Sequence, residues 1–194
     1  MPPNRRLRER VPAQSAMARV VAAQAAAPAR TPIGTVLGVS PLRAQARADY
    51  RAALAELSVG DALDNLGQRW DVLHDLPLRD GALDHLAIGP AGVFAVRTVH
   101  CDGLDAALDS AGLTVGGEPS DDVARARADA EEVADRLGDA SGERIRVRPL
   151  LVLVDARRFT TRSLAPAVRI VVVQELVRVL TKAPGTLDGD RVAA

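Results

Sequence analysis

Residues 70–103 constrain the fold more than any other part of this chain. They contain three short apolar runs, over residues 72–76, 83–88 and 93–96, and the segment Gly-Pro-Ala-Gly at residues 89–92 separates the last two. Apolar runs of this length, divided by Gly and Pro, are typical of β-strands joined by tight turns. The segment therefore predicts three consecutive strands, with a hairpin closed at residues 89–92.

The length of this turn also predicts the register of the hairpin. With a four-residue loop, Ile88 faces Val93, and the pairs that follow along the ladder place Asp84 opposite Arg97. Opposite charges that face each other across an antiparallel pair contribute roughly 0.2–1 kcal/mol. We therefore expect Arg97 to neutralise Asp84 within the hairpin.

The motifs in this segment resemble the core of the nuclease-related domain (NERD) family. The family pattern is an Asp-His on one strand, a Gly-Pro-x-Gly-Val-Phe turn and an acidic-x-Lys motif on the next strand. The first two parts are matched by residues 83–86 (LDHL) and 88–94 (IGPAGVF). The strand that precedes them in the family is resembled by residues 72–76 (VLHDL). The resemblance covers roughly residues 60–180. It implies the PD-(D/E)XK nuclease-like fold, a mixed α/β sheet flanked by helices. It also implies carboxylates that hold a divalent metal and a Lys that positions the attacking water.

Most of the site positions that the resemblance assigns are altered in this chain. Asp84 matches the first carboxylate of the motif, but Arg97 replaces the second acidic residue and Val99 replaces the Lys. Asp61 replaces a Glu of the first core helix, and Arg125 replaces a Gln of a later helix. A hard divalent cation needs several oxygen ligands, whereas arginine repels it and valine has no polar atom. The resemblance thus implies a degenerate site whose remaining catalytic and metal-ligating candidates are Asp84 and Asp61.

Two interpretations of Asp61 remain open. It begins a helical run expected over residues 61–69, where an acidic residue complements the helix dipole, and we favour this structural role. Alternatively, Asp61 and Asp84 bind Mg²⁺ weakly with the help of water molecules. Lys182, the only lysine of the chain, lies too close to the C-terminus for us to expect it at the site.

The single cysteine, Cys101, excludes an intramolecular disulfide and a cysteine-rich zinc site. Neighbouring residues of a strand point to opposite faces, so we do not expect His100, Cys101 and Asp102 to converge on one atom. A Cys–His hydrolase would need His74 or His85 as the partner of the thiol. We expect these two histidines to have structural roles instead.

The rest of the chain completes an α/β pattern. Helices are expected over residues 40–57, beginning at Ser40-Pro41, and over residues 120–137 and 174–182. Continuous apolar runs at residues 147–154 and 168–173 predict strands buried on both faces. We expect one domain over residues 40–183, with a C-terminal tail over residues 184–194. The loop between those two strands carries Arg157, Arg158 and Arg162, which would contact either solvent or a phosphate.

Residues 1–39 have the composition of a disordered basic arm. They contain six Arg and one Glu, a net charge of +5, although the formal net charge of the whole chain is zero. Five prolines interrupt this segment, and its Ala-rich part has only a marginal helical pattern. Contact between the arm and nucleic acid is the alternative, because basic arms bind phosphates whatever the base sequence.

Three functions are compatible with these features. We favour a catalytically degenerate NERD-like module that is associated with DNA or another nucleic acid, or that is regulatory. The alternatives are an active nuclease that uses Asp61 and Asp84 with Mg²⁺ or Mn²⁺, and a protein-interaction scaffold with no nucleic-acid role. We expect no resident cofactor unless the site is active. No apolar run approaches the roughly 18–20 residues of a membrane-spanning helix, so we expect a soluble cytoplasmic protein without membrane contact.

Overall fold

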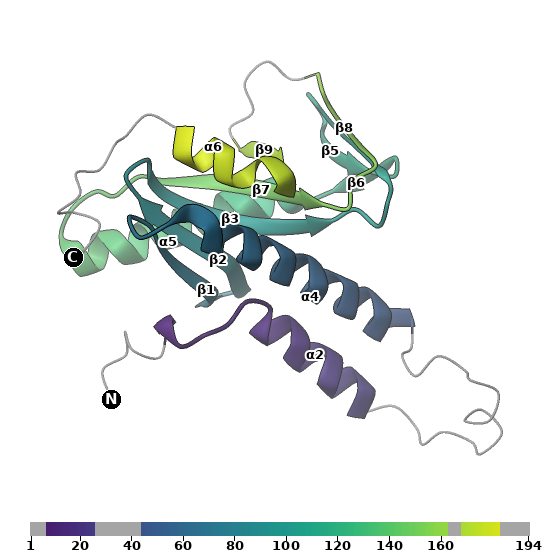
Figure 1. Ribbon diagram of the computed structural model, residues 1–194, viewed down its shortest axis with the longest axis horizontal. Helices are drawn as coiled ribbons and strands as arrows, with labels where there is room; N and C mark the ends of the chain where they lie inside the picture. The colour runs from purple at the N-terminus through teal and green to yellow at the C-terminus, as the bar shows by residue number, and fades with distance from the viewer. Residues whose placement is uncertain (1–6, 26–43, 163–167, 183–194) are drawn as a thin grey trace.

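A five-stranded mixed sheet forms the centre of the computed structural model, which describes residues 7–25, 44–162 and 168–182 (Figure 1). Its strand order is β1-β2-β3-β7-β9, where β1 is Asp71–Leu78, β2 is Gly81–Gly89, β3 is Gly92–His100, β7 is Val147–Val154 and β9 is Arg169–Val172. β1, β2 and β3 are antiparallel neighbours, whereas β3, β7 and β9 run parallel. This is the mixed α/β arrangement that the sequence predicts.

Helices cover both faces of this sheet. The helices α4 (Ala44–Leu63) and α6 (Leu176–Lys182) pack on one face, against Phe94 and Leu150. The helix α5 (Asp122–Ser141) packs on the other face, against Ala95. Because successive residues of a strand point to opposite faces, Phe94 and Ala95 contribute to different core clusters. Two single-turn 3-10 helices, η1 (Asp64–Leu66) and η2 (Val173–Glu175), precede β1 and α6.

A small second sheet has the order β6-β5-β4-β8. Its strands are β4 (Asp105–Asp109), β5 (Gly112–Val115), β6 (Glu118–Ser120) and β8 (Arg158–Thr161). The segment that we expected to be a basic loop therefore includes a strand, β8, which is parallel to β4. Arg157 is ion-paired to Asp105, with 2.8 Å between Nε and Oδ1.

The β2–β3 hairpin has the predicted register. Gly89 pairs with Gly92, Ile88 with Val93, and Leu86 with Ala95. Glycine is required at position 89 because a Cβ atom there would lie only 2.2 Å from the ring of Trp70. Trp70 in turn contacts Phe94, with 6.1 Å between the ring centroids, so the turn and the core beside it are packed as one unit.

The expectation of a disordered N-terminal arm is wrong for residues 7–25. They include the helix α2 (Gln14–Ala25), which lies beside α4 (Figure 1). Ala13 and Ala16 are buried against Ala53 of α4. Small side chains let the two helices approach closely, and such tertiary contacts stabilise a helix that has little amphipathic pattern of its own. Residues 1–6 and 26–39 lie outside the described residues.

The separate helix expected over residues 61–69 is also not present. The helix α4 continues through Gly60 and Asp61 to Leu63. Gly60 does not break the helix; it makes room for Pro12, whose Cγ would lie 2.6 Å from a Cβ atom at position 60. The expected helix start at Ser40-Pro41 and the tail over residues 184–194 lie outside the described residues. Within the described ranges, no helix has the length and apolar character needed to cross a membrane.

Candidate active site

Asp84 lies where the pairing of β2 with β3 ends. The paired residues run from Gly89 and Gly92 to His85 and Val96, and Asp84 is the next residue of β2. Its Oδ2 accepts a hydrogen bond from the backbone N–H of Thr98, at 2.6 Å. The carboxylate therefore satisfies a backbone donor of β3 where the regular ladder stops, and Asp84 is buried there.

Arg97 does not form the predicted direct pair with Asp84. Its guanidinium is bound instead to Asp129 of α5, with Nε at 2.8 Å and Nη2 at 2.6 Å from Oδ2. The prediction failed because it considered only the two strands, whereas α5 brings a better-placed carboxylate over the same face. Arg97 still acts on Asp84 through its charge, which opposes the rise in the pKa of that carboxyl group.

Val99, for which the resemblance implies a lysine, is part of the apolar core. Its side chain is 7% exposed and packs in a cluster that includes Ala126 of α5 and Leu153 of β7. No amine is present at this position, so the residue has no group that could position or activate water.

The structure does not bring Asp61 or Arg125 to Asp84. Asp61 is exposed in the last turn of α4, where the helix dipole does not favour a carboxylate, so the structural role that we favoured for it is wrong. Its backbone oxygen accepts a hydrogen bond from Asn65 Nδ2 at 2.8 Å. Arg125 is exposed on α5 and pairs with Asp121, the N-cap residue of that helix, at 2.7 Å.

Glu56 is the acidic residue of α4 that lies close to Asp84. Burial raises the pKa of Glu56 to about 8, and the negative charge of Asp84 adds to this rise, while Arg19 of α2 opposes it. Burial likewise raises the pKa of Asp84 to about 6, although the hydrogen bond from the Thr98 N–H and the positive charge of Arg97 both lower it. Two neighbouring carboxyl groups in a poorly solvated place retain protons that exposed carboxyl groups would release.

The sequence contained a signal for Glu56 that we did not use. Glu56 precedes Val59 by three residues and Leu63 by seven, and both apolar residues are buried in the core beneath α4. This spacing places the charged residue on the buried stripe of the helix. A carboxyl group on the apolar stripe of α4 predicts a polar or charged partner on the sheet beneath the helix.

His85, the residue after Asp84, is buried and pairs with the half-buried His74 of β1. They face each other across β1 and β2, with 2.8 Å between the two Nδ1 atoms. Burial lowers the pKa of His85 to about 3, with a further contribution from His74, and burial lowers the pKa of His74 as well. Both rings are therefore neutral near pH 7, and one Nδ1–H donates to the other Nδ1.

The N-terminal segment is attached at the same edge of the sheet. Asp75 of β1 is buried and accepts hydrogen bonds from Arg10 and from the backbone N–H and hydroxyl of Ser15. Arg8 pairs with Asp71 at 2.6 Å. Residues 8–15 thus bind β1 through charged and polar contacts, and α2 follows them over α4.

A mixed sheet with helices on both faces, and carboxyl groups where β2 and β3 part, defines a nuclease-like α/β domain. The family described as nuclease-related domain (NERD) matches this chain over residues 51–154. The match spans more than half of the chain, which therefore belongs to the NERD family. No curated protein and no solved structure matches it.

The residues that the sequence resemblance places at the metal positions do not fit a divalent cation. Asp84 is the one carboxylate that the motif retains, and its Oδ2 is bound to the Thr98 N–H. Arg97, whose guanidinium already pairs with Asp129, stands where the resemblance implies a second carboxylate. A hard cation requires several oxygen ligands and is repelled by a neighbouring positive charge.

Proposed function

We propose that this protein is a NERD domain whose nuclease site is degenerate and which acts as a nucleic-acid-associated or regulatory binding module. The observation that carries the proposal is the Arg97–Asp129 ion pair beside Asp84. In metal-dependent cleavage of phosphodiesters, a cation generates hydroxide and stabilises developing charge. Arg97 supplies positive charge at this position but cannot generate hydroxide, because a guanidinium stays protonated and binds no water as a metal does.

An exposed group of arginines supports a nucleic-acid role. Arg144 and Arg146 are exposed just before β7, and Arg148 lies in β7 with its guanidinium 5.5 Å from the ring centroid of Phe94. Among the described contacts, neither Arg144 nor Arg146 has an acidic partner. Arginines without acidic partners are suited to phosphate groups, which they bind without regard to base sequence.

The second candidate function is an active nuclease dependent on Mg²⁺ or Mn²⁺. The observation that favours it is the proximity of Glu56 to Asp84, since two carboxylates with water ligands suffice for some Mg²⁺ sites. In this alternative Glu56 takes the place that we assigned to Asp61.

Plasmid nicking and calorimetric titration of Mg²⁺ and Mn²⁺ separate these two functions. We expect no metal-dependent nicking, and no change in nicking when Asp84→Ala replaces the wild-type chain. Asp135→Asn, at an exposed position of α5, is the matched control for loss of a carboxylate. Nicking that requires metal and disappears in both Asp84→Ala and Glu56→Gln, but not in the control, would establish the active nuclease instead.

Salt-dependent DNA binding separates the binding module from a scaffold with no nucleic-acid role. We expect the affinity for a short duplex to fall steeply with salt, and the Arg144→Gln/Arg146→Gln variant to reduce the log–log salt slope by about 2. Arg125→Gln/Arg178→Gln is the control, because it removes the same charge from two arginines that are already ion-paired on helices. Equal slopes for the two variants would contradict a role of the Arg144 group, and no binding at low salt would favour the scaffold.

A further inference from the structure

We propose that His100, Asp102 and Asp155 form a separate binding site for a divalent transition-metal ion of the Zn²⁺ type. The site lies at the carboxyl ends of β3 and β7, and it contains none of the residues of the Asp84 cluster. It is independent of whether the domain cleaves nucleic acid.

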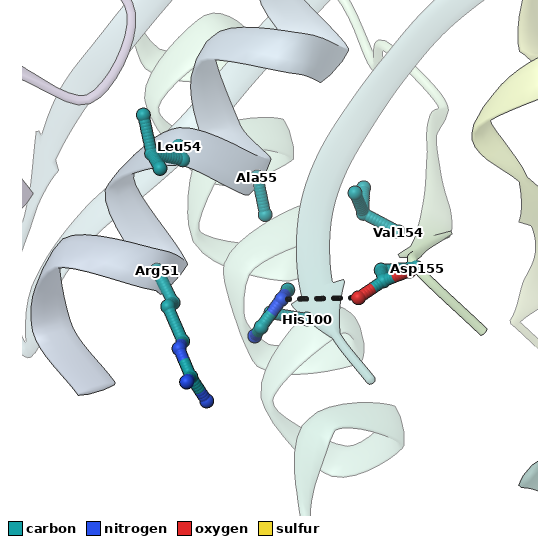
Figure 2. Close-up of a pocket in the computed structure, with 6 residues that line it drawn as sticks. All are labelled: Arg51, Leu54, Ala55, His100, Val154 and Asp155. Carbon is teal, nitrogen blue, oxygen red and sulfur yellow. Dashed lines mark ion pairs between the residues drawn. The ribbon is translucent and has the colours of Figure 1, made fainter. Parts of the chain in front are cut away.

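The topology of the sheet brings the three side chains together. β3 and β7 are parallel neighbours that end side by side, with His100 paired to Val154. Asp102 and Asp155 follow in the two adjoining loops. One ligand atom from each of the three residues lies within 4.8 Å of the other two. His100 Nε2 is 3.9 Å from Asp155 Oδ2, and Figure 2 marks this pair with a dashed line.

The two loops are bound to each other through their backbones. The N–H of Cys101 donates to the oxygen of Val154 at 2.9 Å, and the N–H of Gly103 donates to the oxygen of Asp155 at 2.8 Å. These bonds fix the distance between the segments that carry the ligands. Cys101 itself is buried, with its Sγ 3.8 Å from the oxygen of Val99, so the thiol does not belong to the group.

A cavity beside these side chains provides room for an ion and its water ligands. Its volume is about 140 Å³, and its walls include Arg51, Leu54 and Ala55 of α4 as well as His100 and Asp155 (Figure 2). A water molecule occupies about 30 Å³ in the liquid, so the space accommodates a cation with several waters. Two of the three proposed ligands, His100 and Asp155, line this cavity, whereas Asp102 is not among the residues that line it.

The donor set indicates the class of metal. Imidazole nitrogen suits Zn²⁺ and related transition metals, whereas Mg²⁺ and Ca²⁺ prefer sites made of oxygen alone. Metal–ligand bonds of about 2.0–2.2 Å place neighbouring ligands of a tetrahedral ion about 3.3–3.6 Å apart. The 3.9 Å between His100 and Asp155 needs only a small contraction, which an exposed aspartate makes by side-chain rotation. Three protein ligands leave one position open to water from the cavity.

Arg51 competes with the cation for Asp102. Its Nη1 lies 2.7 Å from each carboxylate oxygen of Asp102, and both side chains are about half exposed. Ion pairs at such exposed positions are weak, so a metal ion can displace the guanidinium. Removal of the positive charge of Arg51 should therefore strengthen metal binding, which is the opposite of what an anion site would show.

Calorimetric titration of the full metal-free chain with ZnCl₂ tests the proposal. We expect one equivalent of Zn²⁺ to bind, and MgCl₂ to bind at least tenfold more weakly. His100→Asn and Asp155→Asn should each weaken Zn²⁺ binding at least tenfold, whereas Arg51→Gln should tighten it severalfold. Asp135→Asn, which removes an exposed carboxylate from α5, should leave the affinity unchanged.

Two further measurements keep the test decisive. Circular dichroism and thermal melting in the presence of chelator confirm that each variant is folded, and the imidazole resonances of His100 should shift on addition of Zn²⁺. Absence of Zn²⁺ binding by the wild-type chain would overturn the proposal. So would binding that persists in His100→Asn, or that is lost in Glu56→Gln and Asp84→Asn, because the ion would then lie elsewhere.

Discussion

Replacement of Glu56 by glutamine should flatten the dependence of stability on pH between about 4.5 and 8. In the folded chain Glu56 keeps its proton up to a pKa of about 8, whereas in the unfolded chain it loses the proton near its ordinary value of 4.5. Across this range the folded state binds more protons than the unfolded state, so a rise in pH favours unfolding. Glutamine has no such proton, and the Glu56→Gln variant should lack this loss of stability.

The size of the effect follows from the pKa of Glu56. A change of one in pKa corresponds to about 1.4 kcal/mol, which sets an upper limit of several kcal/mol on the contribution of Glu56 at pH 8. Glu56 is partly exposed, and repulsion by Asp84 accounts for part of its raised pKa. Solvent screening and the part played by Asp84 both lower the contribution of Glu56 itself to the free energy of unfolding. We therefore expect the Glu56→Gln variant to be more stable than the wild type by about 1–2 kcal/mol at pH 8.

Urea unfolding of both chains at pH 5 and pH 8 measures this difference. At pH 5 the folded and unfolded states differ less in proton binding, so the two chains should be closer in stability there. Glu131→Gln, at an exposed position of α5, is the control and should follow the wild type at both pH values. A Glu56→Gln variant that loses as much stability as the wild type between pH 5 and pH 8 would refute the reasoning.

Two further predictions concern packing and thiol chemistry. Gly89→Ala should lower the free energy of unfolding by about 1–3 kcal/mol, because the added Cβ would overlap the Trp70 ring. Gly138→Ala is the control and should not destabilise α5, because the nearest atom to its added Cβ is the backbone oxygen of Glu143, at 3.5 Å. Urea unfolding of both variants measures the difference. Burial raises the pKa of Cys101 to about 11, so a thiol reagent at pH 8 should modify it far more slowly in the folded chain than in urea. Equal rates in the two conditions would contradict its burial.

The part of the fold that could be predicted from the sequence is the part governed by local rules. The turn at residues 89–92 fixes which residues pair across β2 and β3, and the observed register agrees with it. The continuous apolar run at residues 147–154 is the buried strand β7. In both cases the deciding interactions lie within a few residues of each other, so turn chemistry and apolar spacing were sufficient.

The details of the site depend on contacts between distant segments. Arg97 selects Asp129, which is 32 residues away and is brought over the sheet by α5. Glu56 approaches Asp84 only because α4 packs across the sheet. The helix α2 is held by alanines, whose contribution comes from close contact with α4 rather than from a strong apolar pattern of its own. Spacing within one segment cannot predict which partner another segment will offer.

The electrostatics of the β2–β3 junction connect the altered motif to the stability of the fold. Asp84, Glu56 and Asp129 gather carboxyl groups at the junction, and such groups need either a cation or protons when they are removed from water. Arg97 supplies part of the positive charge, and the raised pKa values of Glu56 and Asp84 show that bound protons supply part of the remainder. Arg97 and these protons offset part of the negative charge of the junction, so we expect Arg97 to stabilise the domain when no metal ion is bound.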